Sequence, residues 1–238
     1  MATVYRAVRE GIEGFERRVA VKVLNADLAQ DPEFVEMFRA EARLAVRLSH
    51  PVLVPVNDLG CADRMHFMAM DLLEGLTLAD LYEHFRKKKK PFPREHALWI
   101  CARVCEGLHY AHELKTEGGE PGNVVHRDVS PRNIFITVSG AVRLVDFGIA
   151  RSADRKGQTQ AGIVKGTVPY MAPEQARAEE LDGRADIFAL GVVLHQMLTG
   201  QMPLKPSSTE AQRQALALEE IEPELKVIHL DLRPAIRG

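Results

Sequence analysis

The hydrophobic pattern of this 238-residue chain changes near residue 75. Before this point, short segments rich in β-branched residues flank a single helical pattern. After it, long patterns with helical spacing dominate, with short apolar strands predicted between them at 124–125, 134–136 and 142–145. The pattern predicts an α+β protein with a small β-rich part at 1–75 and a larger, mainly helical part at 76–238.

The β-rich part begins with a predicted hairpin. Residues 4–8 and 19–24 have the composition of strands and are separated by a segment that contains two glycines. Successive side chains of a strand point to opposite faces, so Ala20 and Lys22 share one face of the second strand. A further strand is predicted at 66–73.

A helix is predicted to start at Asp31-Pro32-Glu33, which combines a capping Asp, a Pro in the first turn and an acid. Glu41 lies on the same face of this helix as four apolar residues, Phe34, Phe38, Ala45 and Leu48. Burying a lone carboxylate costs several kcal/mol, so Glu41 either has a cationic partner across the core or lies at the edge of the apolar face and reaches water.

Two long helices are predicted in the second part. Residues 95–114 are amphipathic, whereas 187–198 are apolar on nearly all sides and end at Gly200, which predicts a buried helix with a glycine cap. Cys101 and Cys105 have the spacing of two metal ligands, but no neighbouring pair completes a site, so we interpret both as small buried hydrophobes.

Composition excludes several classes of partner. Lys and Arg number 31 and Asp and Glu number 33, so the net charge of −2 gives no electrostatic footprint for nucleic acid. No apolar run approaches the ~20 residues that span a bilayer, and three cysteines fit a reducing compartment. We therefore expect a cytoplasmic chain with no membrane segment.

The basic run 86–90 either docks an acidic partner or forms a solvated loop.

Four short motifs follow one another along the chain: Val19-Ala20-Val21-Lys22, Val125-His126-Arg127-Asp128-Val129-Ser130-Pro131-Arg132-Asn133, Asp146-Phe147-Gly148 and Ala172-Pro173-Glu174. Each one alone occurs by chance, but their order and spacing together are specific. In them the chain resembles the protein kinase family, and in particular bacterial eukaryotic-like Ser/Thr kinases. The resemblance covers roughly residues 1 to 203, and it implies the two-lobed kinase fold with a divergent tail from about residue 204.

The resemblance implies ATP and Mg²⁺ as cofactors and assigns roles to five residues. Lys22 would hold the α- and β-phosphates, and Glu41 would pair with Lys22. Asp128 would accept the proton of the substrate hydroxyl, while Asn133 and Asp146 would supply oxygen ligands to Mg²⁺. The alternative is that the last three are ordinary turn-forming residues.

An adenine pocket is implied by the same resemblance. Val4, Ala20 and Phe135 would sandwich the base, and Met70 would lie at the back of the pocket. The backbone from Asp71 to Leu73 would form hydrogen bonds with the base. For Met70 and Phe135, plain core packing is the alternative interpretation, since both roles require an apolar side chain.

Further positions resemble supporting elements of the family. His126 and Phe147 look like members of the hydrophobic spine that couples the lobes, and Asp186 looks like the buried acid that holds the backbone of the catalytic loop. Residues 146–174 resemble an activation segment. Thr159 is the first candidate for its phosphorylation, and Thr167 is a second candidate that is more typical of a residue packed against the catalytic loop.

The sequence departs from the family pattern in three places. Val4 matches the last position of the glycine-rich loop Gly-x-Gly-x-x-Gly-x-Val, which places the earlier glycines before Met1. Ser130 replaces a Lys of the catalytic loop, and the helices that end the family's C-terminal lobe have no clear match. We expect Met1 to be an internal methionine of a longer reading frame and both lobes to be shortened.

The leading functional hypothesis is a protein kinase that phosphorylates Ser or Thr of protein substrates with ATP and Mg²⁺. The alternative is a catalytically impaired, kinase-like module that binds a partner. A third hypothesis is an unstable fragment, because a missing sheet edge exposes core. We expect protein substrates, no nucleic-acid partner and the capacity to form a homodimer.

Overall fold

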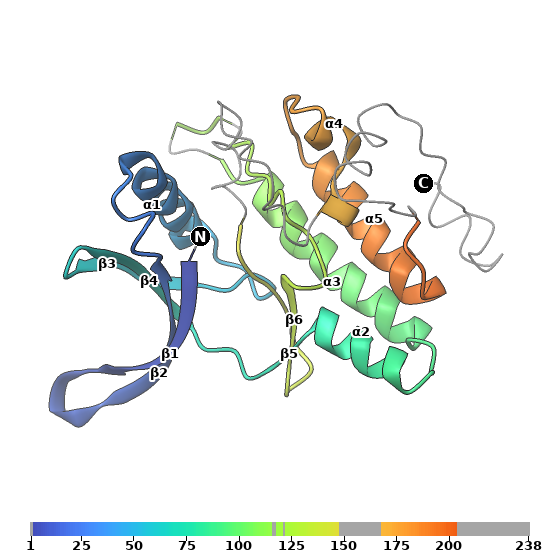
Figure 1. The fold of residues 1–238 in the computed structure, drawn as a ribbon, viewed down its shortest axis with the longest axis horizontal. Coiled ribbons are helices and arrows are strands. Elements are labelled where there is room, and N and C mark those ends of the chain that lie inside the picture. The colour runs from blue at the N-terminus through green and yellow to red at the C-terminus, as the bar shows by residue number, and fades with distance from the viewer. Residues whose placement is uncertain (1, 116–117, 121, 148–167, 204–238) are drawn as a thin grey trace.

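The computed structural model describes residues 2–115, 118–120, 122–147 and 168–203, and these form an α+β structure in two parts. Figure 1 shows the first part as a sheet with helix α1 beside it, and the second part as a group of helices on one side of short strands. The described residues thus confirm the predicted α+β class. None of the helices in the described ranges combines the length and the hydrophobicity needed to cross a membrane.

The first part is an antiparallel sheet with the order β1-β2-β4-β3. Its strands are β1 (Ala2–Glu10), β2 (Glu16–Leu24), β3 (Val56–Ala62) and β4 (Met65–Asp71). β1 and β2 form the predicted hairpin, and a short 3-10 turn at Ile12–Gly14 connects them. The register places Val4 opposite Lys22 and Ala20 opposite Met70, so these four side chains share one face of the sheet.

Helix α1 (Pro32–Arg47) packs on this face. It begins as predicted, because the Asp31 carboxylate accepts a hydrogen bond from Glu33 N (2.9 Å) and Pro32 occupies the first turn. A small core joins the helix to the sheet through Leu24, Phe38, Ala42 and Met68. Glu41 lies beside this core and is 6% exposed.

The second part contains the strands β5 (Gly75–Thr77), β6 (Ile134–Thr137) and β7 (Val142–Leu144) in one antiparallel sheet. Its helices are α2 (Leu78–Lys87), α3 (Arg94–His112), α4 (Pro173–Ala176) and α5 (Arg184–Thr199), with a 3-10 turn at Val168–Tyr170. The largest buried cluster lies here, between α3, α5 and the sheet. α5 ends at Gly200 in the left-handed conformation (φ 73°), as the sequence predicts.

Two local predictions are wrong. Val124 and Val125 are buried but belong to no strand, because the residues that follow them direct their N–H groups to a carboxylate of α5 instead of a neighbouring strand. Cys101 is buried, and burial raises the pKa of its thiol to about 12. Cys105 is exposed, since it lies outside the apolar face of α3.

Gly75 is the first residue of β5, where the chain passes from the first part to the second. A Cβ atom at this position would lie 2.1 Å from the Ile136 carbonyl oxygen and 2.7 Å from Thr137 Cα, so the backbone of β6 approaches too closely for any side chain. We predict that Gly75→Ala lowers the free energy of unfolding by about 1–3 kcal/mol in urea denaturation. Gly191→Ala is the control, because a Cβ there meets nothing within 4 Å and helix propensity predicts a gain of up to about 1 kcal/mol. Wild-type stability of Gly75→Ala would contradict the described β5–β6 pairing.

Candidate active site

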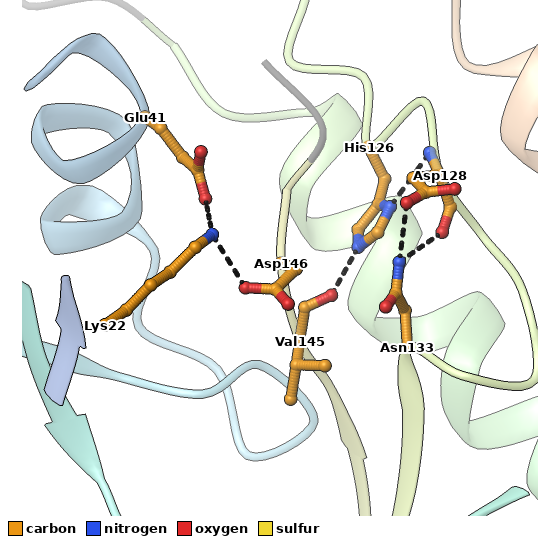
Figure 2. Close-up of polar contacts among 7 residues, drawn as sticks. All are labelled: Lys22, Glu41, His126, Asp128, Asn133, Val145 and Asp146. Carbon is orange, nitrogen blue, oxygen red and sulfur yellow. Dashed lines mark hydrogen bonds and ion pairs between the residues drawn. The ribbon is translucent and has the colours of Figure 1, made fainter. Parts of the chain in front are cut away.

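One ammonium group connects the two parts of the molecule. Lys22 Nζ on β2 lies 2.6 Å from Glu41 Oε1 on α1 and 2.9 Å from Asp146 Oδ1, which follows β7 (Figure 2). Burial alone would lower the pKa of the Lys22 ammonium, but the two carboxylates outweigh it and raise the pKa above its usual value. Lys22 is therefore a fully charged cation held between two acids.

The position of Glu41 has a clear physical explanation. Its side chain is 8% exposed, so it does not reach water at the edge of the helix, and that alternative is wrong. Burial raises the pKa of the Glu41 carboxyl, while the charge of Lys22 opposes this effect. The ion pair supplies the cationic partner that the apolar face requires.

A second polar group lies in the loop before β6. Asn133 Nδ2 donates hydrogen bonds to the backbone oxygen of Asp128 (2.8 Å) and to its Oδ2 (2.9 Å), which fixes the direction of the Asp128 carboxylate (Figure 2). The Asn133 backbone oxygen accepts from Val145 N (2.9 Å), so this loop is tied to the segment that carries Asp146.

His126 also links the same two segments. Its Nε2 lies 3.0 Å from the Val145 carbonyl oxygen, and its Nδ1 accepts a hydrogen bond from Asp128 N (3.3 Å). These partners assign the proton to Nε2. Complete burial lowers the pKa of this imidazole, so the ring is neutral at pH 7. The ring also packs against Phe147 at a centroid distance of 4.6 Å, so the two residues predicted to belong to one hydrophobic spine are in contact.

Asp186 on α5 holds the backbone of the loop. Its Oδ2 accepts from His126 N and its Oδ1 accepts from Arg127 N, both at 2.8 Å, and its side chain is 1% exposed. Arg127 has φ 67°, a conformation that costs free energy for a residue with a side chain. The two hydrogen bonds stabilise this conformation, as predicted for Asp186.

Two residues that support the loop were not predicted as such. His112 Nε2 on α3 lies 2.8 Å from Asp186 Oδ2, and Gln175 Nε2 donates to the Arg127 carbonyl oxygen at 2.8 Å. Nothing in the local sequence signals these contacts, because each joins segments that are more than 45 residues apart.

The donor set fits a hard divalent cation. Because Asn133 uses its amide nitrogen for both bonds to Asp128, its Oδ1 is left for a ligand, and the Asp146 side chain is 44% exposed. Amide and carboxylate oxygens are the ligands that Mg²⁺ prefers, and phosphate oxygens and water complete its coordination. Within the described residues no cluster of three or more His, Cys, Asp or Glu side chains could hold a metal. A metal here would therefore share its coordination with a substrate.

The residues predicted around adenine come from both parts of the molecule. Val4, Ala20 and Met70 lie on the sheet face that carries Lys22, and Phe135 lies on β6 in the second part. Val4 is 57% exposed, so it covers the region only partly.

The predicted hydrogen bonds with the adenine base involve the backbone from Asp71 to Leu73, which connects the two parts. The Asp71 carboxylate accepts from Arg17 (2.7 Å) and Asn57 (2.8 Å), so its side chain is already engaged. The N–H group of Leu73 makes no hydrogen bond within the described residues and is left to donate to a ligand.

A cavity of about 620 Å³ also borders residues 71–74, but none of the five predicted catalytic residues lines it. Thr159 and Thr167 lie outside the described residues.

Known proteins resemble this chain in sequence. A family model described as the protein kinase domain matches residues 1–235. Tyrosine-protein kinase MasK of Myxococcus xanthus is 43% identical over 223 residues, which are 94% of this chain and 34% of that protein. Serine/threonine-protein kinase PknB of Mycobacterium tuberculosis is 39% identical over 198 residues, 81% of this chain and 30% of that protein. The chain thus spans about a third of the length of these curated relatives.

Solved structures resemble the chain in fold. The crystal structure of the M. tuberculosis PknI kinase domain superimposes with a TM-score of 0.68 at 29% sequence identity. The match covers 99% of this chain and 80% of that one. The two-part architecture therefore has the fold that the sequence resemblance implied.

The Lys22–Glu41 pair yields a stability prediction. Lys22→Met leaves Glu41 buried without a cation, which we predict lowers the free energy of unfolding by about 3 kcal/mol at pH 7. The double variant Lys22→Met, Glu41→Leu should recover most of this loss, since it buries no lone charge. Urea denaturation measures both, with Lys88→Met at an exposed position as the control. A loss below about 0.5 kcal/mol for Lys22→Met would contradict a buried pair.

Proposed function

Because this chain belongs to the protein kinase family, we propose that it transfers the γ-phosphate of ATP to Ser and Thr hydroxyls of proteins. The observation that carries the proposal is the arrangement of Lys22, Asp146, Asn133 and Asp128. They lie in one site, with the cation on the sheet and the oxygen-bearing groups on the second part. The proposed use of ATP and the three cysteines that form no disulfide favour a cytoplasmic location.

The proposed mechanism begins with nucleotide binding. Lys22 holds the α- and β-phosphates, and Glu41 keeps its ammonium directed toward them. Asn133 Oδ1 and the Asp146 carboxylate would hold Mg²⁺. When bound, this ion neutralises charge on the phosphates. The adenine base lies between Val4, Ala20 and Phe135, beside Met70, and bonds with the backbone from Asp71 to Leu73.

The chemical step requires positioning more than covalent work by the protein. The oxygen of the substrate hydroxyl forms a bond with the γ-phosphorus, and the bond from that phosphorus to the oxygen bridging to the β-phosphate breaks. ADP leaves with the electron pair of the broken bond. The hydroxyl proton passes to the Asp128 carboxylate, which the Asn133 amide holds in place at 2.9 Å.

Regulation by phosphorylation is a further part of the proposal. A phosphate on Thr159 brings close to two negative charges, which could pair with Arg127 next to Asp128. Thr167 is the second candidate for this modification. Phosphopeptide mapping of an active preparation tests both positions.

The acceptor amino acid has one alternative. The resemblance to MasK, which is named a tyrosine-protein kinase, favours a tyrosine hydroxyl, whereas the resemblance to PknB favours Ser and Thr. A kinase-like binding module is the alternative from a different class, and it predicts nucleotide binding without transfer.

Phosphotransfer by the purified chain tests the proposal. With Mg²⁺, labelled ATP and a generic protein acceptor, we expect label on phosphoserine and phosphothreonine after acid hydrolysis. Asp128→Asn removes the proton acceptor and should reduce the rate by about 10²–10⁴-fold, while Asp58→Asn on the exposed side of β3 should not.

Three other outcomes would contradict the proposal in different ways. Label that survives Asp128→Asn would indicate a contaminating kinase. Label confined to phosphotyrosine would favour the tyrosine alternative. A thermal shift with nucleotide but no transfer would support the binding module.

A further inference from the structure

The cavity of about 620 Å³ beside residues 71–74 has no part in the proposed phosphotransfer. Three segments line it: the loop that follows α1 at residues 49–55, the connector between the two parts at residues 71–74, and β6 and β7 with their turn, within residues 137–143. Both parts of the molecule therefore border the cavity. Its volume is within the range of pockets that bind small molecules, about 300–1,000 Å³.

The cavity and the predicted adenine pocket share only the connector. Phe135 on β6 is paired directly with Arg143 on β7, so the two side chains lie on the same face of this sheet. Phe135 belongs to the predicted adenine pocket and does not line the cavity, whereas Arg143 does. Val4, Ala20 and Met70 do not line it either. The cavity therefore has room for a second ligand beside a bound nucleotide.

Arg143 brings a positive charge without a partner to this cavity. Its side chain forms no hydrogen bond and no ion pair among the residues that the structure describes, and the residue is half-buried. A guanidinium remains protonated in proteins, and its N–H groups form a planar fork that matches the two oxygens of a carboxylate. The cavity thus presents this fork to a negatively charged group.

The two carboxylates that border the cavity already have cations beside them. An Asp71 oxygen accepts a hydrogen bond from Arg17 Nη2 at 2.7 Å. Glu74 Oε1 lies 3.9 Å from Arg18 Nη1, and the Glu74 side chain is 65% exposed. Because these acids repel further negative charge, a singly charged carboxylate suits the cavity better than a doubly charged phosphate.

His50 contributes a neutral hydrogen-bond donor. Its Nδ1 accepts from Val52 N at 3.2 Å, which assigns the ring proton to Nε2. Burial, and to a smaller extent the charge of Arg103, lowers the pKa of this imidazole, so the ring is neutral at pH 7. Within the described part of the chain, Nε2 has no hydrogen-bond partner and is left to donate to a ligand.

Most of the remaining lining is apolar. It includes Pro51, Leu53, Pro55, Leu72, Val138 and Ala141. Burial of apolar ligand surface against these side chains is favourable, whereas a small hydrophilic anion such as acetate would leave them without a contact. The lining therefore suits an anion that carries an apolar body.

We propose that this cavity binds a small organic carboxylate with an apolar body, and that Arg143 holds the carboxylate. The proposal goes beyond the kinase activity and does not depend on it, because none of the five proposed catalytic residues lines the cavity. Two parallel hydrogen bonds from one guanidinium are stronger than bonds to a neutral group. We expect an affinity about ten-fold higher for a carboxylate than for a neutral molecule of the same shape.

Binding of 2-naphthoate tests the proposal, with 2-naphthamide as the neutral molecule of the same shape. Ligand-detected NMR titrations of the purified chain at pH 7 give both dissociation constants. We expect a Kd of about 1 mM or lower for 2-naphthoate, as for a ligand of this size, and a Kd about ten-fold higher for the amide. Saturation with a non-hydrolysable ATP analogue and Mg²⁺ should not displace 2-naphthoate.

Three variants locate the site and separate charge from shape. Arg143→Met keeps much of the apolar stem and should reduce the affinity for 2-naphthoate to that of the amide. Arg9→Met is the matched control, because it makes the same charge change at an exposed position of β1 that does not line the cavity. Ala141→Leu fills part of the cavity and should weaken both ligands by about five-fold or more. Circular dichroism confirms that each variant is folded.

Four results would overturn the proposal. Equal affinities of the wild-type chain for the carboxylate and the amide would show that no cation holds the ligand. An unchanged affinity of Arg143→Met for 2-naphthoate would exclude this guanidinium. Displacement of 2-naphthoate by the ATP analogue would place it in the adenine pocket, and absence of binding up to about 10 mM would show that the cavity takes no such ligand.

Discussion

The contact of Lys22 with two carboxylates is the constraint on which the rest of the site depends. Glu41 belongs to α1, which packs on the first sheet, whereas Asp146 belongs to the second part, so one cation at 2.6 and 2.9 Å sets the distance between them. Glu41 is the buried partner and keeps Lys22 in place, while Asp146 is the exposed one. This difference suits a site in which Asp146 contacts a metal ion and Lys22 contacts phosphate. The buried Glu41 carboxylate stays paired with Lys22 in such a site, so it offsets the free-energy cost of removing the Lys22 charge from water.

The second part adds a rigid loop to this site. Asp186 receives two backbone N–H groups of the loop, and His126 spans from Val145 to Asp128 N. These contacts fix the left-handed backbone at Arg127, so the neighbouring Asp128 has little freedom. The position of Asp128 is therefore determined by the packing of α5 against the loop, and not by the loop's own sequence preferences.

The sequence predicted the elements whose causes are local. The start of α1 follows from its capping residues, and the position of Glu41 on an apolar helix face follows from helical spacing. The alternation of side chains along β2 places Ala20 and Lys22 on the same face. The mistaken strand at 124–125 shows the limit, since apolar β-branched residues look alike in a strand and in a buried loop. The support of the loop by His112 was equally invisible, because it depends on a contact across 74 residues that periodicity does not encode.

Binding of a non-hydrolysable ATP analogue, measured by isothermal titration calorimetry with and without Mg²⁺, tests the central claim most directly. If Lys22, Asn133 and Asp146 converge on one metal-bound triphosphate, Mg²⁺ should tighten binding at least about ten-fold, or about 1.4 kcal/mol. Asp146→Asn should remove most of this dependence on the metal. Equal affinity with Mg²⁺ and with a chelator, or an unchanged metal dependence in Asp146→Asn, would contradict the account.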